Sequence, residues 1–353
     1  MNAWPHTGRM QKGFSVVEGL MVLALTNANA TLMVVDLQTG QPQMVTVDAA
    51  NALGGVGVLR SANGHLSALY AGDAKGQLWR FDLNANYQWL ASATPLFSAR
   101  GPTGLVQAFT QAPQVLASPR GGVQVIAGTG ALHTEDDAQS AAIESVYAVW
   151  DKPADNLLRP LQRQQLAGRQ LVSVSVPAAT SGVLSLVGAP GSLVGMRGDP
   201  VNWSSQRGYV LDLGLVNGMR VLEPLQTLSA QVGWWPLLAP ARLGQVCDVT
   251  PALSVGLIVQ LQEGLMLSDA LADTNSDGLI NALDTPVAGV GRRLMSPVFQ
   301  GERACASGLC DTTLSLPATS AGVKLRLHEV SVQTGARVIQ DRTWRRLVNP
   351  PLR

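Results

Sequence analysis

The sequence predicts an all-β fold for most of its 353 residues. From residue 30 onward, short apolar runs alternate with turns rich in Gly, Asn, Asp and Pro, a pattern typical of strands and hairpins. Few stretches show the 3.6-residue periodicity of an amphipathic helix. With 36 Gly, 20 Pro and only 14% charged residues, the composition excludes a disordered tail, a coiled coil and a collagen-like repeat, leaving one or two globular domains.

The charge balance excludes partners that would be held by a strong electrostatic field of the whole chain. The chain has 25 basic and 24 acidic side chains, a net charge of +1. Such a balance cannot hold nucleic acid by counterion release, so we expect no nucleic-acid partner. A chain of this length also buries enough apolar surface to fold without a metal or a disulfide.

An apolar strand that ends near an Asp or Ser and is followed by a polar turn recurs five times. The ends of consecutive copies are 46, 69, 61 and 119 residues apart, which fits one four-stranded unit per interval and two units in the last. This repetition predicts a β-propeller-like body over residues 31–353, an incomplete ring of about five to six blades. An unrelated set of β-sandwiches is the alternative. The copies end at Asp36, Asp82, Asp151, Asp212 and Ser331.

Residues 1–30 have the features of an export leader. Residues 1–13 are basic, and an apolar run follows over residues 14–25. About 12 residues at ~1.5 Å per residue cannot cross a hydrocarbon core of about 30 Å, so we expect no stable transmembrane span. One route is a secretory signal cut after Ala28-Asn29-Ala30, which has the small-x-small pattern of a cleavage site.

The second route uses a carboxylate within the apolar run. The segment from Lys12 through Gly13 and Phe14 to Glu18 resembles the leader of type IV prepilins and pseudopilins. In that family cleavage follows the glycine and leaves a carboxylate at the fifth mature position. The resemblance implies that Glu18 pairs with the amino group of a neighbouring subunit, which would offset the cost of burying it. Either route exports the chain through the inner membrane of a Gram-negative bacterium.

The cysteines predict one short disulfide. Cys305 and Cys310 enclose only four residues, whereas Cys247 has no near neighbour. A flexible loop of that length can bring two thiols within bonding distance. The alternative is three reduced thiols in a cytosolic protein, and the predicted export favours the disulfide.

One segment carries a specific family resemblance. Tyr70-Ala-Gly-Asp73-Ala-Lys-Gly76-Gln-Leu-Trp79-Arg-Phe-Asp82-Leu83 closely resembles the signature strand pair of PilY-type pilus tip adhesins. The resemblance implies the carboxy-terminal propeller of an extracellular adhesin at the pilus tip, which supports type IV pilus assembly and responds to calcium. Its implied partners are minor pilins and a host or abiotic surface. Further matches lie at residues 127–130, 145–151, 201–213 and 341–345.

Residues 273–284 have the donor spacing of an EF-hand or dockerin-like calcium loop. Oxygen donors fall at loop positions 1, 3, 5, 9 and 12, a backbone carbonyl serves position 7, and Gly278 permits the bend at position 6. Position 12 is Asp rather than Glu, which predicts affinity for Ca²⁺ in the weak, extracellular range. An Asx-rich surface turn is the alternative. The predicted ligands are Asp273, Asn275, Asp277, Leu279, Asn281 and Asp284.

A candidate adhesive tripeptide lies elsewhere in the chain. Arg197, Gly198 and Asp199 form the sequence that integrins read on a loop tip, and Pro200 after it favours an extended, exposed turn. A tripeptide also arises by chance in a chain of this length. We therefore keep chance occurrence as the alternative.

Enzyme motifs are absent from the sequence. It contains no Gly-x-Ser-x-Gly elbow, no phosphate-binding glycine-rich loop and no His-Glu-x-x-His pair. We therefore predict a binding protein and not an enzyme. Two alternatives remain: a secreted quinoprotein-like propeller dehydrogenase, which would need a central cofactor pocket with a stacking tryptophan, and a generic secreted propeller binding module.

Overall fold

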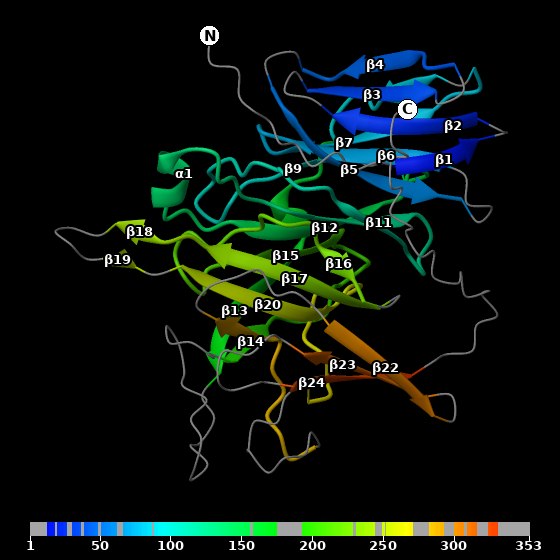
Figure 1. Ribbon diagram of the computed structural model, residues 1–353. Coiled ribbons are helices and arrows are strands. Elements are labelled where there is room, and N and C mark those ends of the chain that lie inside the picture. Colours follow the sequence, from blue (N-terminus) through cyan, green and yellow to red (C-terminus); the bar gives the residue numbers. More distant parts are fainter. Residues whose placement is uncertain are drawn as a thin grey trace, which may run out of the picture.

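In the computed structural model, the regular secondary structure of the described residues is almost entirely β-strand, which confirms the all-β prediction (Figure 1). Its helices are α1 (Glu135–Gln139) and the 3₁₀ turn η1 (Arg163–Gln165). Among the residues described, no helix combines the length and the apolar character that a membrane crossing requires. The structure describes residues 13–17, 20–26, 30–36, 39–48, 51–61, 66–86, 88–155, 158–174, 193–228, 231–243, 249–250, 252–270, 282–292, 300–306, 309–315 and 324–330.

The first sheet is a four-stranded antiparallel meander in the order β1-β2-β3-β4. It includes part of the predicted leader, because β2 pairs with β3 from Val22↔Asp36 to Thr26↔Leu32. The described residues of the apolar run are therefore in strands, where pairing satisfies their backbone groups. Cleavage of a leader stays a prediction. The strands are β1 (Gly13–Val17), β2 (Leu20–Thr26), β3 (Thr31–Asp36) and β4 (Pro42–Thr46).

The second sheet contains the signature segment, which folds as the β6–β7 hairpin with Tyr70 opposite Arg80. The hairpin turns at Gly76, whose φ of +76° suits glycine. Apolar side chains from this sheet and from β3 form one buried cluster, so the two sheets pack face to face. The strands are β5 (Leu53–Arg60), β6 (Leu66–Asp73), β7 (Gln77–Leu83), β8 (Trp89–Ala91) and β9 (Phe97–Ser98).

The third sheet has ten strands in the order β10-β11-β12-β15-β13-β14-β21-β20-β17-β16. A parallel pairing of β13 with β15 joins two antiparallel groups, so neighbouring repeat units share one continuous sheet. The strands are β10 (Gln114–Ala117), β11 (Val123–Gly128), β12 (Ser145–Asp151), β13 (Ala167–Val174), β14 (Leu193–Arg197), β15 (Gly208–Asp212), β16 (Gln226–Thr227), β17 (Val232–Ala239), β20 (Leu253–Gln260) and β21 (Gly289–Arg292).

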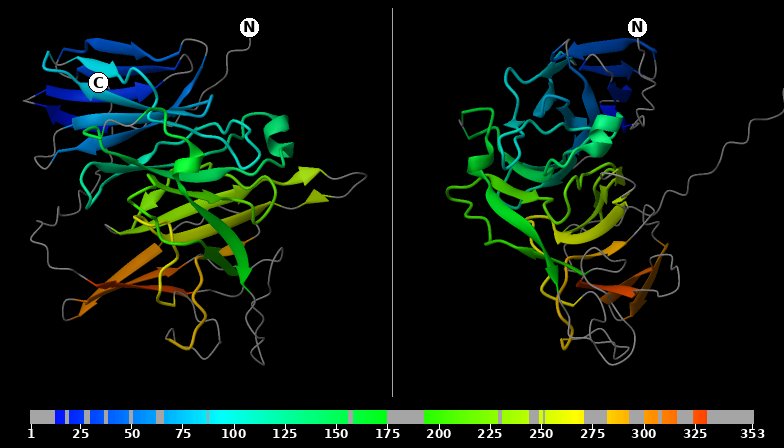
Figure 2. Two further views of the ribbon diagram at one scale, coloured as in Figure 1. Left: turned by 180° about the vertical axis from the view of Figure 1, so that it is seen from behind. Right: turned by 90° about the vertical axis from the view of Figure 1, so that its left-hand side faces the viewer.

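Two smaller sheets complete the described part. Seen from several sides, the first two sheets lie on one side of the ten-stranded sheet and the β22–β24 sheet lies on the other (Figure 2). The remaining strands are β18 (Arg242–Leu243), β19 (Val249–Thr250), β22 (Gln300–Ala306), β23 (Leu309–Ser315) and β24 (Lys324–Val330).

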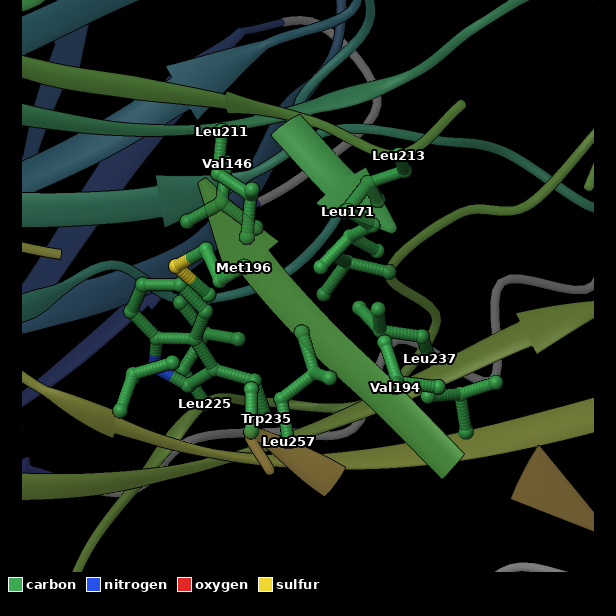
Figure 3. Close-up of a cluster of buried hydrophobic side chains, with 14 of the residues drawn as sticks. Val146, Leu171, Val194, Met196, Leu211, Leu213, Leu225, Trp235, Leu237 and Leu257 are labelled. Atoms are coloured by element: carbon green, nitrogen blue, oxygen red, sulfur yellow. The ribbon is translucent and has the colours of Figure 1, made fainter. Parts of the chain in front are cut away.

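The central strands of the ten-stranded sheet are buried on both faces. In β12, Val146 and Ala148 face one apolar cluster, whereas Tyr147 and Val149 face another. Side chains alternate between the faces of a strand, so a strand between two cores reads as an unbroken apolar run. The larger cluster includes Trp235, which is fully buried (Figure 3).

Candidate functional site

The signature segment ties the second sheet to the third. The Tyr70 hydroxyl donates to Asp151 Oδ2 at 2.8 Å, and the same oxygen accepts from Arg80 at 2.8 Å. Arg159 donates to the other oxygen, Oδ1, at 2.6 Å. Both Tyr70 and Asp151 are fully buried. The β6–β7 hairpin is thereby joined to the end of β12.

The charge of Asp151 is stabilised by these partners. Burial alone would raise the pKa of the Asp151 carboxyl, but the hydrogen bonds from Arg159, Arg80 and Tyr70 outweigh burial and lower it below its ordinary value. Burial and the neighbouring carboxylate raise the pKa of the Tyr70 hydroxyl. The cluster therefore contains an ionised acid and a neutral phenol at neutral pH. It is suited to holding sheets together rather than to proton transfer.

Asp73 stabilises the turn of the same hairpin. Its Oδ1 accepts from the backbone N–H groups of Lys75 (2.9 Å) and Gln77 (2.8 Å), and its Oδ2 accepts from Trp79 Nε1 (2.8 Å). Burial raises the pKa of the Asp73 carboxyl, although each of these hydrogen bonds acts in the opposite direction. Trp79 is thus fixed by a hydrogen bond within its own hairpin.

Two further buried tyrosines donate hydrogen bonds to distant segments of the chain, which the sequence analysis did not predict. The Tyr147 hydroxyl donates to the carbonyl of Arg100 at 2.7 Å, and that of Tyr209 donates to the carbonyl of Leu261 at 2.8 Å. Each tyrosine, like Tyr70, lies three or four residues before the aspartate that ends its strand. That repeated Tyr–Asp spacing is the signal that could have predicted these hydrogen bonds.

The predicted calcium loop lies outside the described residues except for its last three positions, 282–284, of which Asp284 is the one predicted ligand. Asp284 is only 5% exposed, whereas the preceding Leu283 is 79% exposed. The loop belongs to the connection between β20 and β21, which pair antiparallel with Leu257 opposite Gly289. A carboxylate held in the interior is suited to pairing or metal coordination. Within the described part alone, no three His, Cys, Asp or Glu side chains gather closely enough to hold a metal.

The candidate adhesive tripeptide lies on the surface at the end of β14. Arg197, Gly198 and Asp199 are all exposed. Gly198 has φ of +151°, and a Cβ there would lie 2.6 Å from Arg169 Cδ. Arg169 is 1% exposed and donates to the carbonyl of Glu263 through Nε and Nη2. The exposed turn therefore rests on a buried arginine.

The other predicted residues are described only by their backbone or lie outside the described residues. Cys305 and Cys310 are direct register partners in the β22–β23 hairpin, and the disulfide between them stays a prediction. Gly13 and Phe14 begin β1. Glu18 and Cys247 lie outside the described residues.

Repeated β units joined by hydrogen bonds from buried tyrosines define a β-propeller-like protein, and comparisons identify the relatives. No family model matches the chain. It is 27% identical over 337 residues to a PilY1 homolog, a type IV pilus biogenesis factor of Xylella fastidiosa, covering 92% of this chain and 25% of the relative. It is 28% identical over 259 residues to PilY1 of Pseudomonas aeruginosa, covering 61% of this chain and 21% of the relative. The chain is thus homologous to PilY1 proteins and spans a quarter or less of their length.

A solved structure supports the same fold. The crystal structure of the Pseudomonas aeruginosa PilY1 C-terminal domain matches with a TM-score of 0.63 and 21% identity, covering 89% of this chain and 71% of that chain. The sequence similarity to PilY1 proteins confirms the PilY-type resemblance, and the shared fold confirms the prediction of a propeller-like fold, whereas the prepilin-like leader stays a prediction. The residues that join the sheets contribute to that fold.

Proposed function

We propose that the chain is a PilY1-like component of the type IV pilus that binds calcium, supports pilus assembly and attaches the cell to a surface without catalysis. The observation that carries this proposal is the shared fold with the PilY1 C-terminal domain over 89% of the chain, together with sequence similarity to PilY1 biogenesis factors. The site of action is then the cell surface, after export through the inner membrane.

The calcium part of the proposal rests on the donor spacing and on one buried carboxylate. Asp273, Asn275, Asp277 and Asn281 would supply side-chain oxygens and Leu279 a carbonyl, with Asp284 closing the shell. Asp284 is held in the interior at the exit of the loop. Bound calcium would offset the repulsion among the three carboxylates and order the β20–β21 connection.

The attachment part has a candidate contact in the exposed turn of Arg197, Gly198 and Asp199. Its backbone is supported by Arg169, so the turn is displayed on a rigid base. Minor pilins are the proposed assembly partners, because the similar curated proteins are type IV pilus biogenesis factors.

A genetic and biochemical experiment tests the proposal. The gene is deleted in its host, and the intact coding sequence is returned with an affinity tag. We expect loss of surface pili and attachment on deletion, restoration on complementation, and co-purification of minor pilins with the tagged protein. Normal pili and attachment in the deletion strain would contradict the proposal.

The enzymatic alternative is tested in the same preparation. Purified protein is mixed with pyrroloquinoline quinone and calcium, and absorbance and alcohol oxidation are followed. A bound-cofactor band with substrate turnover would favour a quinoprotein dehydrogenase. We expect neither signal.

A further inference from the structure

Two tryptophans, one at the end of β12 and one in the segment between β14 and β15, meet edge to face. The ring centroids of Trp150 and Trp203 are 5.7 Å apart, with an interplanar angle of 88°. Trp150 is at the end of β12 and is 7% exposed, and Trp203 follows β14. Trp150 Nε1 donates to the carbonyl of Gly121 at 2.8 Å, which fixes the β10–β11 turn against this pair.

Three cations cover the faces of these rings. The Arg120 guanidinium carbon lies 4.4 Å from the Trp203 ring centroid. Lys152 Nζ and the Arg207 guanidinium carbon lie 5.3 Å and 5.2 Å from that of Trp150. Side-chain stacking of this kind pre-orients the charged groups while their N–H donors stay accessible. We call these five residues the cation–tryptophan patch.

The carboxylates beside the patch do not use up its donors. Glu263 accepts from the Val201 backbone N–H at 2.8 Å and from Trp203 Nε1 at 2.9 Å, and lies 3.8 Å from Arg120. Asp155 lies 3.3 Å from Lys152 and 4.0 Å from Arg207. Within the residues described, we find no hydrogen bond donated by the side chains of the three cations.

Exposure of the charged groups makes this a surface that a ligand can reach. The side chains of Arg120, Lys152 and Arg207 are 38%, 36% and 19% exposed, and those of Glu263 and Asp155 are 20% and 25% exposed. Cations with free donors recognise carboxylate and sulfate groups. Neighbouring carboxylates accept hydrogen bonds from hydroxyl groups.

We propose that the cation–tryptophan patch binds an acidic polysaccharide. Such a polymer presents anionic groups to the three cations and hydroxyl groups to Asp155 and Glu263 at the same time. Nucleic acid fits less well, because the indole faces are covered and cannot serve as stacking platforms for bases. A lipid surface fits less well, because Trp150 is buried and cannot insert.

This proposal is independent of a role in the pilus. It is tested on the purified full chain. Calorimetric titrations use heparin as a sulfated probe, polygalacturonate as a carboxylated probe and dextran as a neutral control. The variant Arg120→Gln, Lys152→Gln, Arg207→Gln keeps a polar side chain at each position and removes three charges. We expect binding of at least one anionic probe, no binding of dextran, and about a ten-fold loss of affinity with a weaker salt dependence in the variant.

A matched variant controls for net charge. Arg60→Gln, Lys75→Gln, Arg100→Gln removes three charges from residues outside the patch, and we expect its affinity to stay within about two-fold of that of the unsubstituted chain. Equal losses in the two variants, or failure of both anionic probes to bind, would overturn the proposal.

A footprint on the unsubstituted protein covers the case in which the patch variant fails to fold. Lysine acylation is followed by mass spectrometry with and without the bound probe. We expect protection of Lys152, which lies in the patch, and no protection of Lys75, which is 53% exposed and pairs with Asp48. Equal reactivity of Lys152 in the two conditions would show that the probe binds elsewhere.

Discussion

The hydroxyl of Tyr70 donates to the carboxylate of Asp151 at 2.8 Å, across a sequence separation of 81 residues and between two different sheets. The carboxylate is fully buried and also receives one hydrogen bond each from Arg80 and Arg159. A buried carboxylate that loses its charge leaves its cationic partners uncompensated. Asp151 is therefore the centre of the polar contacts that join the second and third sheets.

Asp151→Asn should lower the free energy of unfolding by about 3 kcal/mol, the low end for breaking a buried ion pair. The low end applies because the side chains of Arg80 and Arg159 are 17% and 20% exposed and recover some hydration. Tyr70→Phe removes one hydrogen bond and should cost about 1 kcal/mol. Urea unfolding measures both. Asp82→Asn, at a side chain that is 49% exposed, is the control and should cost less than about 1 kcal/mol.

The contribution of Asp151 should depend on pH in a defined direction. Its partners lower the folded-state pKa below the unfolded value of about 4, so ionisation stabilises the fold above that pH. This stabilisation is lost as the pH falls through the folded-state pKa. The stability difference between the unsubstituted chain and Asp151→Asn should be largest above about pH 5 and shrink below about pH 4. A difference that stays constant from pH 7 to pH 3 would contradict this account.

Gly198→Ala should destabilise the exposed turn. The φ of +151° is strained for any other residue, and the added Cβ would lie 2.7 Å from the carbonyl oxygen of Gly168. We expect a loss of about 1–3 kcal/mol in thermal unfolding. Gly168→Ala is the matched control, because a Cβ at Gly168 meets nothing within 4 Å, and it should change stability by less than about 0.5 kcal/mol. Equal effects would show that backbone strain does not maintain the turn.

The sequence predicts the features of this fold that are local. Alternating apolar runs and Gly-rich turns identify strands such as β6 and β7, and the signature segment places its own turn at Gly76. The repeated strand ends predict a protein built from similar β units. These signals lie within a few residues of the structure that they specify, so they can be read without knowing the fold.

Contacts between distant segments could not be predicted in this way. The parallel pairing of β13 with β15 merges two units into one sheet, and no residue within either strand indicates that partner. Trp150 and Trp203 are 53 residues apart in the chain yet touch edge to face. Long-range packing decides which polar side chains meet, so the cation–tryptophan patch is visible only in the structure.

Cys305 and Cys310 should form a disulfide in the exported protein. Direct register partners in an antiparallel pair have Cα atoms about 4.5–5.5 Å apart, which falls in the range that disulfides span. Mass spectrometry of alkylated, unreduced protein should find these two residues unlabelled and Cys247 labelled. Labelling of all three cysteines in protein secreted by its native host would contradict the prediction. Cys305→Ser with Cys310→Ser provides the matched reduced reference.

Calcium should stabilise the chain through the loop between β20 and β21. Binding to the folded state alone adds about 2.7 kcal/mol when calcium is present at 100 times its Kd. Asp273→Asn with Asp277→Asn removes two of the three predicted carboxylate ligands while keeping side-chain size, so calorimetry should show no binding and calcium should no longer raise Tm.

Asp269→Asn is the control for that experiment, because Asp269 is exposed and precedes the loop. It should bind calcium as the unsubstituted chain does. Asp284→Asn should weaken binding even though its side chain is buried, since the twelfth position closes the coordination shell. If Asp284→Asn binds calcium normally while Asp273→Asn with Asp277→Asn does not, the buried carboxylate stabilises the β20–β21 connection without contacting the ion.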